Sequence, residues 1–441
     1  MTEIVIGVST LNELKHALES NVERGAALFM NFDAPRGRYL VHEVQIAGME
    51  DCISASEIGI TFAPQFLTYI TRRAREAQKS LGLLHTHPNG FSNFSGIDDR
   101  TEEGLADFMS SRSGGQPCFA FVLCDGKLIA RRFGTAERVA VRVVGATIDM
   151  LELVDGVDSE SERYDRQIRA FGEEGQAILK SLSVAIVGLG GTGSVTAQQL
   201  AHLGVEQFIL FDGDTIEKTN LNRVVGANEK SVGHRKVEVA AAMIRGINAN
   251  AEVLEQAASV RAASALAALR QADCIFICTD SHSSRAFLSE FAYQYLIPAF
   301  DIGVSINAHE GKVNAVTGRT QMLAPGLPCL WCSNAIDAGR IREELMSEAD
   351  RAADPYFNEG GVKQPAVISV NSAMVSMAVS MFLGAFTAIP VTARWQSYDA
   401  LSGKVRFLAP DSDPGCGVCG HEGVTGAGDK RELSLLEQEA E

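Results

Sequence analysis

The stretch VAIVGLGGTGS, residues 184–194, decides the fold of the larger part of this chain. A short apolar run of the kind that forms a buried strand leads directly into a glycine-rich loop, and a helix is expected to follow. The loop glycines lie where a tight turn and a close approach to phosphate require a missing side chain. They are Gly188, Gly190, Gly191 and Gly193. The stretch therefore predicts a strand, a loop and a helix that bind a nucleotide at the helix N-terminus.

The segments around this stretch extend the prediction to a whole domain. From Ser183 onward, strand-like and helix-like segments alternate along the chain. The strand-like segments are SVAIVG, QFILFD, AEVLEQ, CIFICTD and IPAFDIG. Alternation at these lengths predicts an α/β fold, Rossmann-like and doubly wound, in which helices cover both faces of a parallel sheet.

Polar residues near the strand ends distinguish ATP from NAD as the ligand. Asp212, at the end of the second strand, suits NAD as well as ATP because it can bond a ribose hydroxyl. A further set has no use in an NAD site, since it combines cations that compensate a triphosphate with acids that hold magnesium. Its members are Asp214, Asn220, Asn222, Arg223, Lys236 and Asp280. The sequence therefore favours ATP with Mg²⁺.

A second informative stretch, LLHTHPNGFSNFSGIDD, occupies residues 83–99 of an N-terminal region whose strand and helix patterns predict an α+β unit. His85 and His87 leave a strand two residues apart, which turns both imidazoles to one side. Asp98, at the start of the next helix, can return to the same point. Two imidazoles and one carboxylate suit zinc with an open fourth position for water, which is the arrangement of a hydrolytic site. A lone His-x-His pair is more often a surface loop, but the full spacing through Ser95 to Asp98 is far more specific.

This spacing, His-x-His-x7-Ser-x-x-Asp, resembles the motif of the JAMM (JAB/MPN) metalloproteases, which cleave peptide or isopeptide bonds after the C-terminus of ubiquitin-like proteins. The resemblance implies a JAB/MPN-like domain over residues 1–153. It also implies that the two histidines and Asp98 bind a catalytic zinc ion and that Ser95 stabilises the oxyanion. An upstream glutamate would be the general base, and Glu23 fits the family position best. Its competitors are Glu19 and Glu43.

The later part of the chain, Arg163 to Cys419, resembles the ThiF/MoeB and ubiquitin-activating-enzyme superfamily. Five motifs appear in family order: RYDRQI, GLGGTGS, DGDTIEKTNLNR, RKVE and CTD. Such enzymes adenylate the C-terminal glycine carboxylate of a ubiquitin-like protein. The resemblance implies that Asp212 binds the ribose and that Asp280 helps to hold magnesium near the α-phosphate. It implies phosphate contacts from Asn222, Arg223 and Lys236. Arg166 would reach ATP, in MoeB-like enzymes from the neighbouring subunit of a homodimer.

Four of the nine cysteines form two Cys-x-x-Cys pairs. The pairs Cys329/Cys332 and Cys416/Cys419 predict a structural zinc site, which the family places in these positions. The other five lie mostly in apolar runs and are expected in the core. They are Cys52, Cys118, Cys124, Cys274 and Cys278. The segment 333–365, where many relatives carry a catalytic cysteine, has none, so a thioester on this chain is not expected unless Cys274 or Cys278 is exposed.

Length and composition predict two globular domains. The formal net charge of −16 excludes a basic stripe and argues against nucleic-acid binding. The first residues resemble neither a signal peptide nor a transit peptide, which predicts a cytoplasmic protein. The uncharged stretch 366–393 carries serines at helical spacing, and a buried core helix is favoured over a membrane span. The expected boundaries are 1–153, a linker at 154–162, 163–420 and a disordered tail at 421–441.

Both regions would act on the same kind of group, a C-terminal glycyl carboxylate. The main hypothesis is a bifunctional enzyme of a bacterial-type ubiquitin-like protein pathway. Its zinc peptidase would cleave after the C-terminal glycine, and its adenylyltransferase would activate that carboxylate, with a possible conjugating enzyme as a later partner. One alternative is activation of a sulfur-carrier protein for thiocarboxylate formation with a sulfur donor. Another is a catalytically reduced scaffold that only binds its ubiquitin-like partner.

Overall fold

The computed structural model describes residues 2–149, 161–309, 312–347, 365–409 and 411–437. The chain divides into two compact units. Unit 1 contains Met1–Gly145, Gln294–Leu296 and Val424–Arg431, and unit 2 contains the remainder. Most of the linker predicted at 154–162 lies outside the described residues, and the helix α4 begins at Ser161.

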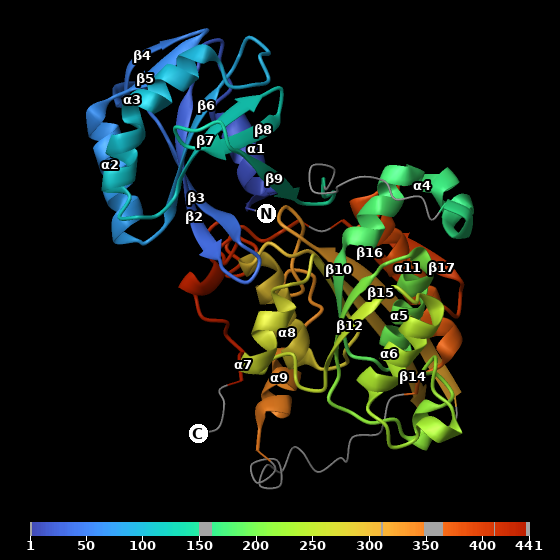
Figure 1. Cartoon of the computed structure of the whole chain (residues 1–441). Coiled ribbons are helices and arrows are strands. Elements are labelled where there is room, and N and C mark those ends of the chain that lie inside the picture. The colour runs from blue at the N-terminus through green and yellow to red at the C-terminus, as the bar shows by residue number, and fades with distance from the viewer. Residues whose placement is uncertain (1, 150–160, 310–311, 348–364, 410, 438–441) are drawn as a thin grey trace. The chain divides into compact units, whose positions relative to one another are not determined.

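Unit 1 is built on a closed β-barrel, coloured blue to teal in Figure 1. The strand order is β1, β3, β2, β6, β7, β8, β9, and β1 closes the barrel by pairing in parallel with both β3 and β9. The barrel strands are β1 (Glu3–Gly7), β2 (Gly25–Asp33), β3 (Arg38–Ile46), β6 (Ser80–Thr86), β7 (Cys118–Cys124), β8 (Lys127–Arg132) and β9 (Arg138–Val144). The other elements are α1 (Val8–Ala17), η1 (Met49–Asp51), the β4 (Cys52–Ser56) and β5 (Gly59–Phe62) hairpin, α2 (Pro64–Glu76) and α3 (Gly96–Arg112).

Two apolar clusters stabilise unit 1. One includes Leu14 of α1 and barrel residues such as Leu28 and Phe121. The other joins α2 and α3 to the opposite side of β2 and β6, with Ile70 and Met109 fully buried. Alternate residues of β2 enter different clusters, as expected for a strand whose two faces are both covered. The expected α+β unit is therefore observed. Packing on both faces fixes β2 and β6 at the point where the histidine motif begins.

The segment Val424–Arg431 is part of unit 1, although it follows both Cys-x-x-Cys pairs in the sequence. Asn31 of β2 donates hydrogen bonds to the carbonyl oxygens of Gly426 and Ala427, both at 3.0 Å. Gly426 has a φ of 71°, and a side chain there would collide with the backbone of Val41. The prediction of a disordered tail from 421 is therefore wrong for these residues. That prediction rests on the polar composition of the segment. Composition does not indicate that Val424 and Ala427 are buried, or that the backbone carbonyls accept hydrogen bonds from a distant strand.

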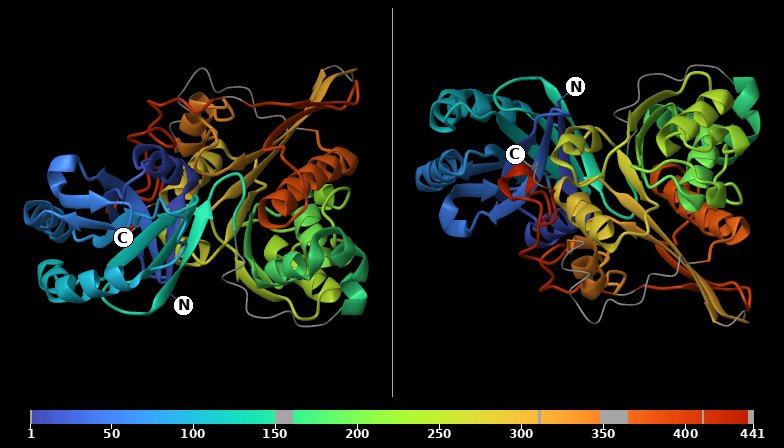
Figure 2. Two further views of the ribbon diagram at one scale, coloured as in Figure 1. Left: turned by 90° about the horizontal axis from the view of Figure 1, so that it is seen from above. Right: turned by 90° about the horizontal axis from the view of Figure 1, so that it is seen from below.

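Unit 2 contains an eight-stranded sheet in the order β12, β11, β10, β13, β14, β15, β16, β17. The first five strands are parallel, which confirms the predicted α/β core. The last three are antiparallel and extend the sheet along the long β14–β15 hairpin (Figure 2). This extension was not predicted, because the sequence alternation that suggested the fold ends at β14. The strands are β10 (Ser183–Val187), β11 (Gln207–Phe211), β12 (Glu252–Gln256), β13 (Cys274–Ile277), β14 (Ala299–His309), β15 (Lys312–Leu323), β16 (Trp395–Asp399) and β17 (Lys404–Phe407).

The helices of unit 2 follow the predicted alternation. They are α4 (Ser161–Ser181), α5 (Gly191–Leu203), α6 (Lys236–Ile247), α7 (Ala263–Leu269), α8 (His282–Gln294), α9 (Ala338–Leu345) and α11 (Ile368–Phe386). Short 3-10 turns occur at η3 (Lys218–Asn220) and η4 (Glu229–Ser231), and η6 (Gly428–Lys430) belongs to the unit 1 segment. The helix α4 bends at Gly172, whose φ of 79° is outside the helical region.

The helix α11 occupies the long uncharged stretch of the sequence. By length and composition alone this helix could cross a membrane. Half of its most apolar 18-residue stretch is buried within the protein. The buried residues include Met374, Phe382 and Phe386. Phe382 makes ring contacts with Phe276 of β13 and Phe300 of β14, which places this face of the helix against the sheet.

Candidate functional site

The histidine motif of unit 1 forms a compact cluster of metal-ligand atoms. His85 is on β6, His87 follows the strand directly, and Asp98 is in the first turn of α3. The Nε2 atoms of the two histidines are 3.1 Å apart. Asp98 places Oδ1 at 3.1 Å from His85 Nε2 and Oδ2 at 3.5 Å from His87 Nε2. Two imidazole nitrogens and a carboxylate that converge within 4.8 Å of one another offer the donor set that suits a zinc ion.

Surrounding contacts fix the orientation of these ligands. The Nδ1 atom of His87 lies 2.7 Å from the carbonyl oxygen of Phe91, so Nδ1 carries the proton and Nε2 presents a lone pair to the cluster. Ser95 is the N-cap of α3, and its hydroxyl accepts from the backbone N–H groups of Ile97 and Asp98. The backbone N–H of Ser95 donates to Asp98 Oδ2 in return. The hydroxyl proton of Ser95 remains available to a substrate oxygen, because the capping bonds use only its lone pairs.

Glu23 is the glutamate that the fold brings to this cluster. β2 and β6 pair with Gly25 opposite His85, which places Glu23 beside His87. Its Oε1 is 3.9 Å from His87 Nε2, and the residue is 2% exposed. Burial raises the pKa of this carboxyl, against the opposing influence of His85 and His87. Its Oε2 has no hydrogen-bond partner, as expected for a base that accepts a proton from a molecule still to be bound.

The two competing glutamates lie elsewhere. Glu43 forms ion pairs with Arg73 and Lys79. Glu19 is exposed after the end of α1.

A charge cluster that the motif analysis missed, buried at Arg131 and Glu102 and exposed at Asp99, holds α3 in place. Arg131 of β8 donates to Glu102 through both Nε and Nη2, and to Asp99 through Nη1 at 2.7 Å. Its guanidinium also lies 3.9 Å from the ring centroid of Phe94. The cluster therefore holds both the first turns of α3 and the loop before Ser95. Nothing in the sequence marked Arg131, because it lies 33 residues beyond Asp98 and acts only after β8 has paired.

The glycine-rich loop of unit 2 has the predicted backbone. Gly188 adopts a φ of 87°, and a side chain there would press against the backbone of Cys278 and Thr279 at the end of β13. A side chain on Gly193 would collide with the carbonyl of Gly188, and one on Gly191 would collide with Asn371 of α11. Gly190, the N-cap of α5, has open space before it. The loop therefore leaves the N-terminus of α5 open to a phosphate.

The predicted nucleotide-binding residues gather beside this loop. Asp212 accepts hydrogen bonds from the backbone N–H groups of Leu189 and Asp214, at 2.6 and 2.9 Å, and its pKa is raised by burial. Lys236 lies at the start of α6 between two acids, 2.6 Å from Asp214 and 3.8 Å from Asp212. The side chain of Arg223 lies along Gly191, and its guanidinium donates to the carbonyl of Thr219 and the side chain of Asn222. These contacts bring two cations and two acids to the edge where a ribose and phosphates would bind.

Asp280 lies in a separate part of the same edge. It follows β13 and lines a polar pocket of about 460 Å³. The other lining residues are Ser259, Arg261, Ser281, Ser283, Ser284 and Glu344. Glu344 of α9 accepts four hydrogen bonds from residues 281–283 and so fastens α9 to the N-terminus of α8. Arg166 is exposed on α4, and no hydrogen bond or ion pair joins its side chain to the glycine-rich loop among the described residues. Its predicted role from a neighbouring subunit stays a prediction.

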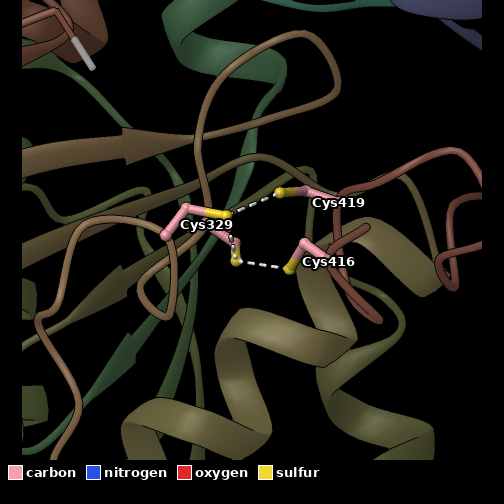
Figure 3. Close-up of side chains that lie close together, drawn as sticks. Cys329, Cys416 and Cys419 are labelled. Carbon is pink, nitrogen blue, oxygen red and sulfur yellow. Dashed lines mark hydrogen bonds between the residues drawn. The ribbon is translucent and has the colours of Figure 1, made fainter. Parts of the chain in front are cut away.

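The two Cys-x-x-Cys pairs meet in space across 87 residues of sequence. The four Sγ atoms lie within 4.8 Å of one another, including Cys329 to Cys416 at 3.6 Å and Cys332 to Cys419 at 3.5 Å. The side chains of the labelled cysteines turn toward one another in Figure 3. Four converging thiols fit one tetrahedral zinc ion, because each would otherwise be a poorly partnered sulfur.

The remaining cysteines do not offer a nucleophile. Cys274 and Cys278 are 0% and 8% exposed. Burial raises the pKa of the Cys278 thiol to about 12, and Cys124 is also buried. Cys52 and Cys118, expected in the core, are half-buried, and burial raises the pKa of Cys118 to about 11. Burial also raises the pKa of Cys52 and Cys124, so a thiolate on Cys52, Cys118, Cys124 or Cys278 is disfavoured at neutral pH.

The fold and the phosphate loop of unit 2 define a nucleotide-binding α/β protein. The ThiF family model matches residues 164–418, and the chain belongs to the ThiF family. The match covers most of unit 2 and does not bear on the zinc-ligand cluster of unit 1.

Several curated proteins resemble this chain. The molybdopterin-synthase adenylyltransferase of Escherichia coli is 30% identical over 265 residues, which are 60% of this chain and 98% of that protein. The SAMP-activating enzyme E1 of Haloferax volcanii is 28% identical over 60% of this chain and 91% of its own length. The adenylyltransferase and sulfurtransferase MOCS3 of Arabidopsis thaliana is 30% identical over 58% of this chain and 52% of its own length. Family and relatives together support adenylyltransferase activity in unit 2.

Among solved structures, E. coli MccB with AMPCPP and MccA has 23% sequence identity. It covers 60% of this chain and 75% of its own, with a TM-score of 0.49. This likeness is weak.

Proposed function

We propose that unit 2 uses ATP to adenylate the C-terminal carboxylate of a ubiquitin-like protein of the sulfur-carrier kind. The observation that carries this proposal is membership of the ThiF family together with the gathering of Asp212, Arg223 and Lys236 beside an open glycine-rich loop. In the reaction, a carboxylate oxygen attacks the α-phosphorus of ATP. The bond from that phosphorus to the bridging oxygen breaks, and pyrophosphate leaves.

The residues divide the work according to their chemistry. Asp212 bonds the ribose, and the α5 N-terminus with Lys236, Arg223 and Asn222 neutralises the phosphates. Asp280, with Asp214 as a second acid, suits Mg²⁺, a hard cation that prefers carboxylate oxygens. Arg166 would complete the site from a second copy of the chain, so the active form in this proposal is a homodimer. The lysine is held between two acids until ATP phosphates replace them as its partners.

The relatives favour sulfur transfer over conjugation as the fate of the acyl adenylate. Two of the three reported relatives carry names that refer to molybdopterin synthase or sulfurtransfer. The Haloferax volcanii relative is named an E1, so transfer to a conjugating enzyme is the second possibility. The stretch 333–365 contains no cysteine, and Cys274 and Cys278 are buried. The enzyme therefore releases its activated carboxylate to an external acceptor, and a cytoplasmic location would give it ATP and that acceptor.

The adenylation proposal is tested by isotope exchange between pyrophosphate and ATP. Purified protein with Mg²⁺ is mixed with a small ubiquitin-like protein that ends in Gly-Gly, taken from the same genome. Exchange should depend on that protein and should vanish when its last glycine is deleted. Exchange without any added carboxylate, or none with any candidate carrier, would contradict the proposal.

We also infer that unit 1 is a zinc peptidase that cleaves after the C-terminal glycine of the same class of protein. The observation that favours this second activity is the convergence of His85, His87 and Asp98 with the buried, unpartnered Oε2 of Glu23. The donor set fits zinc, which when bound supplies a Lewis acid for amide hydrolysis. Glu23 takes the proton of the attacking water and can pass it to the leaving amine. Ser95 donates a hydrogen bond to the oxygen that becomes negative.

The peptidase proposal is tested with a fusion of the ubiquitin-like protein to a reporter through Gly-Gly. Elemental analysis should find about two zinc ions per chain, one at each donor cluster. His87→Ala should remove one ion and all cleavage, whereas the cysteine-bound ion should remain. A protein that cleaves the fusion with only the cysteine-bound ion present would overturn the peptidase assignment. A scaffold without catalysis, the remaining alternative, would show binding of the carrier but neither exchange nor cleavage.

A further inference from the structure

A buried group of one acid and two arginines lies near the predicted nucleotide edge of unit 2. Asp301 of β14 is fully buried. Arg319 of β15 donates from Nη2 to Asp301 Oδ2 at 2.7 Å. Arg285, in the first turns of α8, has its Nε 3.4 Å from Asp301 Oδ1 and donates from Nη2 to the carbonyl of Ile302. The side chains of the two arginines are 12% and 23% exposed.

The charges of this group do not balance. Among the described residues, Asp301 is the sole carboxylate within ion-pair distance of either guanidinium. The Nε atoms of both arginines and the Oδ1 atom of Asp301 are buried without hydrogen-bond partners. Two largely buried cations against one anion leave one positive charge uncompensated, which is costly unless an anion binds. A second, external anion would restore neutrality.

The backbone at Gly303 leaves the position of a missing side chain beside both guanidinium groups. This residue pairs with Arg319 in the β14–β15 register. A side chain added at Gly303 would be 3.6 Å from Arg285 Nη2 and 3.7 Å from Arg319 Nη2. Both guanidinium groups therefore face the same small volume over a residue without a side chain. Paired guanidinium groups of this kind match the two oxygens of a carboxylate.

The position of Gly303 connects this volume with the adenylation edge. Asp301 pairs with Ile277, the last residue of β13, so Gly303 lies beyond the end of β13 and alongside the segment that continues to Asp280. Ligands of open α/β sheets bind outside the carboxyl ends of the strands. A carboxylate that must approach the polyphosphate of ATP is repelled by it, and a local positive charge reduces this repulsion.

We propose that Arg285 and Arg319 form the docking subsite for the terminal carboxylate of the polypeptide that unit 2 adenylates. This inference rests on the proposed adenylation. Asp301 holds the two guanidinium groups side by side, and Gly303 leaves the room that the carboxylate fills. The subsite binds the carboxylate before this group reacts with ATP. Formation of the acyl phosphate bond removes the negative charge of the carboxylate, so the two arginines then release the acyl group.

The test measures binding of a synthetic decapeptide that ends in Gly-Gly and carries an N-terminal fluorescein. One form has a free terminal carboxylate and the other a terminal amide. By fluorescence anisotropy, the wild-type protein should bind the acid at least about 10-fold more tightly than the amide, since a charged hydrogen-bonded pair contributes that much. Arg319→Gln should abolish this preference. Gly303→Ala should also reduce it, because the added methyl group makes only ordinary contacts with the arginines but occupies the carboxylate position.

Controls separate the subsite from folding and from the proposed function. Lys404→Gln removes an exposed cation on β17 of the same sheet and should keep the preference. Binding of a fluorescent ATP analogue should be unchanged in every variant, which verifies that each is folded. Equal or absent binding of acid and amide to the wild-type protein would overturn the inference, as would an undiminished preference in Arg319→Gln. If the acid is preferred but pyrophosphate exchange is never detected, the adenylation proposal fails while the carboxylate subsite stands.

Discussion

The zinc-ligand cluster of unit 1 and the nucleotide edge of unit 2 are assembled in opposite ways. In unit 1, three ligands come from residues 85–98 and their donor atoms already converge. In unit 2, the candidate residues extend from Gly188 to Asp280 over several loops and the start of α6, and Lys236 and Arg223 are satisfied by neighbouring protein oxygens. Under the proposed functions, a metal site is preformed by local sequence, whereas a site for a large anion keeps its cations paired with protein oxygens until the anion binds.

The largest expected effect concerns the base in the preformed cluster. Glu23→Gln keeps the shape of the side chain but removes its ability to take a proton, so cleavage of the fusion should fall about 10³-fold. Zinc content should not change, because Glu23 is not among the ligands. Glu43→Gln is the matched control, since Glu43 is paired with Arg73 and Lys79 and should leave cleavage intact. The opposite result for the two variants would assign the base to Glu43.

The next effect concerns the dispersed site. Asp280→Ala should lower pyrophosphate exchange about 10²-fold, because it removes magnesium support at the phosphorus where charge develops. Cleavage by unit 1 and the content of both zinc ions should remain at wild-type levels. If the variant loses cleavage as well, the two sites are not independent and the contrast between them fails.

Much of this arrangement is predictable where the determining residues are close in sequence. The phosphate loop, the five parallel strands and the His85–Asp98 cluster follow from local periodicity and spacing, because these elements form from neighbouring residues. Glu23 was selected from three glutamates only by family position, and its burial beside His87 depends on the pairing of β2 with β6.

The features that sequence did not reveal depend on distant contacts. Arg131 reaches α3 only after β8 pairs with β7, and Val424–Arg431 joins unit 1 through bonds to Asn31 across almost 400 residues. The amino-acid composition indicates neither of these two contacts. The same is true of Arg285 and Arg319, which meet because α8 and β15 both contact Asp301.

The next prediction concerns Arg131, whose contacts hold the first turn of α3 beside the histidine cluster. Arg131→Gln should break the bonds to Glu102 and Asp99 and the stacking on Phe94, which frees the first turn that carries Asp98. Zinc affinity at the histidine cluster should fall about tenfold, as is typical when residues that orient metal ligands are lost. Competition with a fluorescent chelator measures this affinity. Arg132→Gln, an exposed neighbour, should have no effect, and equal affinity in both variants would show that the ligands need no such support.

The added C-terminal segment contributes stability to unit 1. Asn31→Ala removes two hydrogen bonds and leaves two buried carbonyls without this donor, which should cost about 2 kcal/mol. Amide hydrogen exchange in β2 and β3 should accelerate. Both tryptophans belong to unit 2, so the denaturation curve followed by tryptophan fluorescence should hardly change. A variant with unaltered exchange in β2 would mean that Val424–Arg431 does not hold the strand. Asn21→Ala, at an exposed position, serves as the control.

The smallest expected effect concerns the buried thiols near the phosphate loop. Cys278 packs against Gly188 and Gly193, lies 3.6 Å from the hydroxyl of Thr196, and has a pKa raised by burial to about 12. Such a thiol is protonated throughout the neutral range and cannot attack an acyl adenylate. Cys278→Ser should therefore keep pyrophosphate exchange within about twofold of wild type, since a serine hydroxyl can take over the contact with Thr196. On a non-reducing gel after reaction with ATP and the ubiquitin-like protein, the wild-type enzyme should show no thiol-sensitive band of enzyme plus carrier. A band that disappears in Cys278→Ser would make this residue the acceptor of the acyl group. The dispersed site would then carry its own nucleophile, and the acyl group would no longer pass directly from the adenylate to an external acceptor.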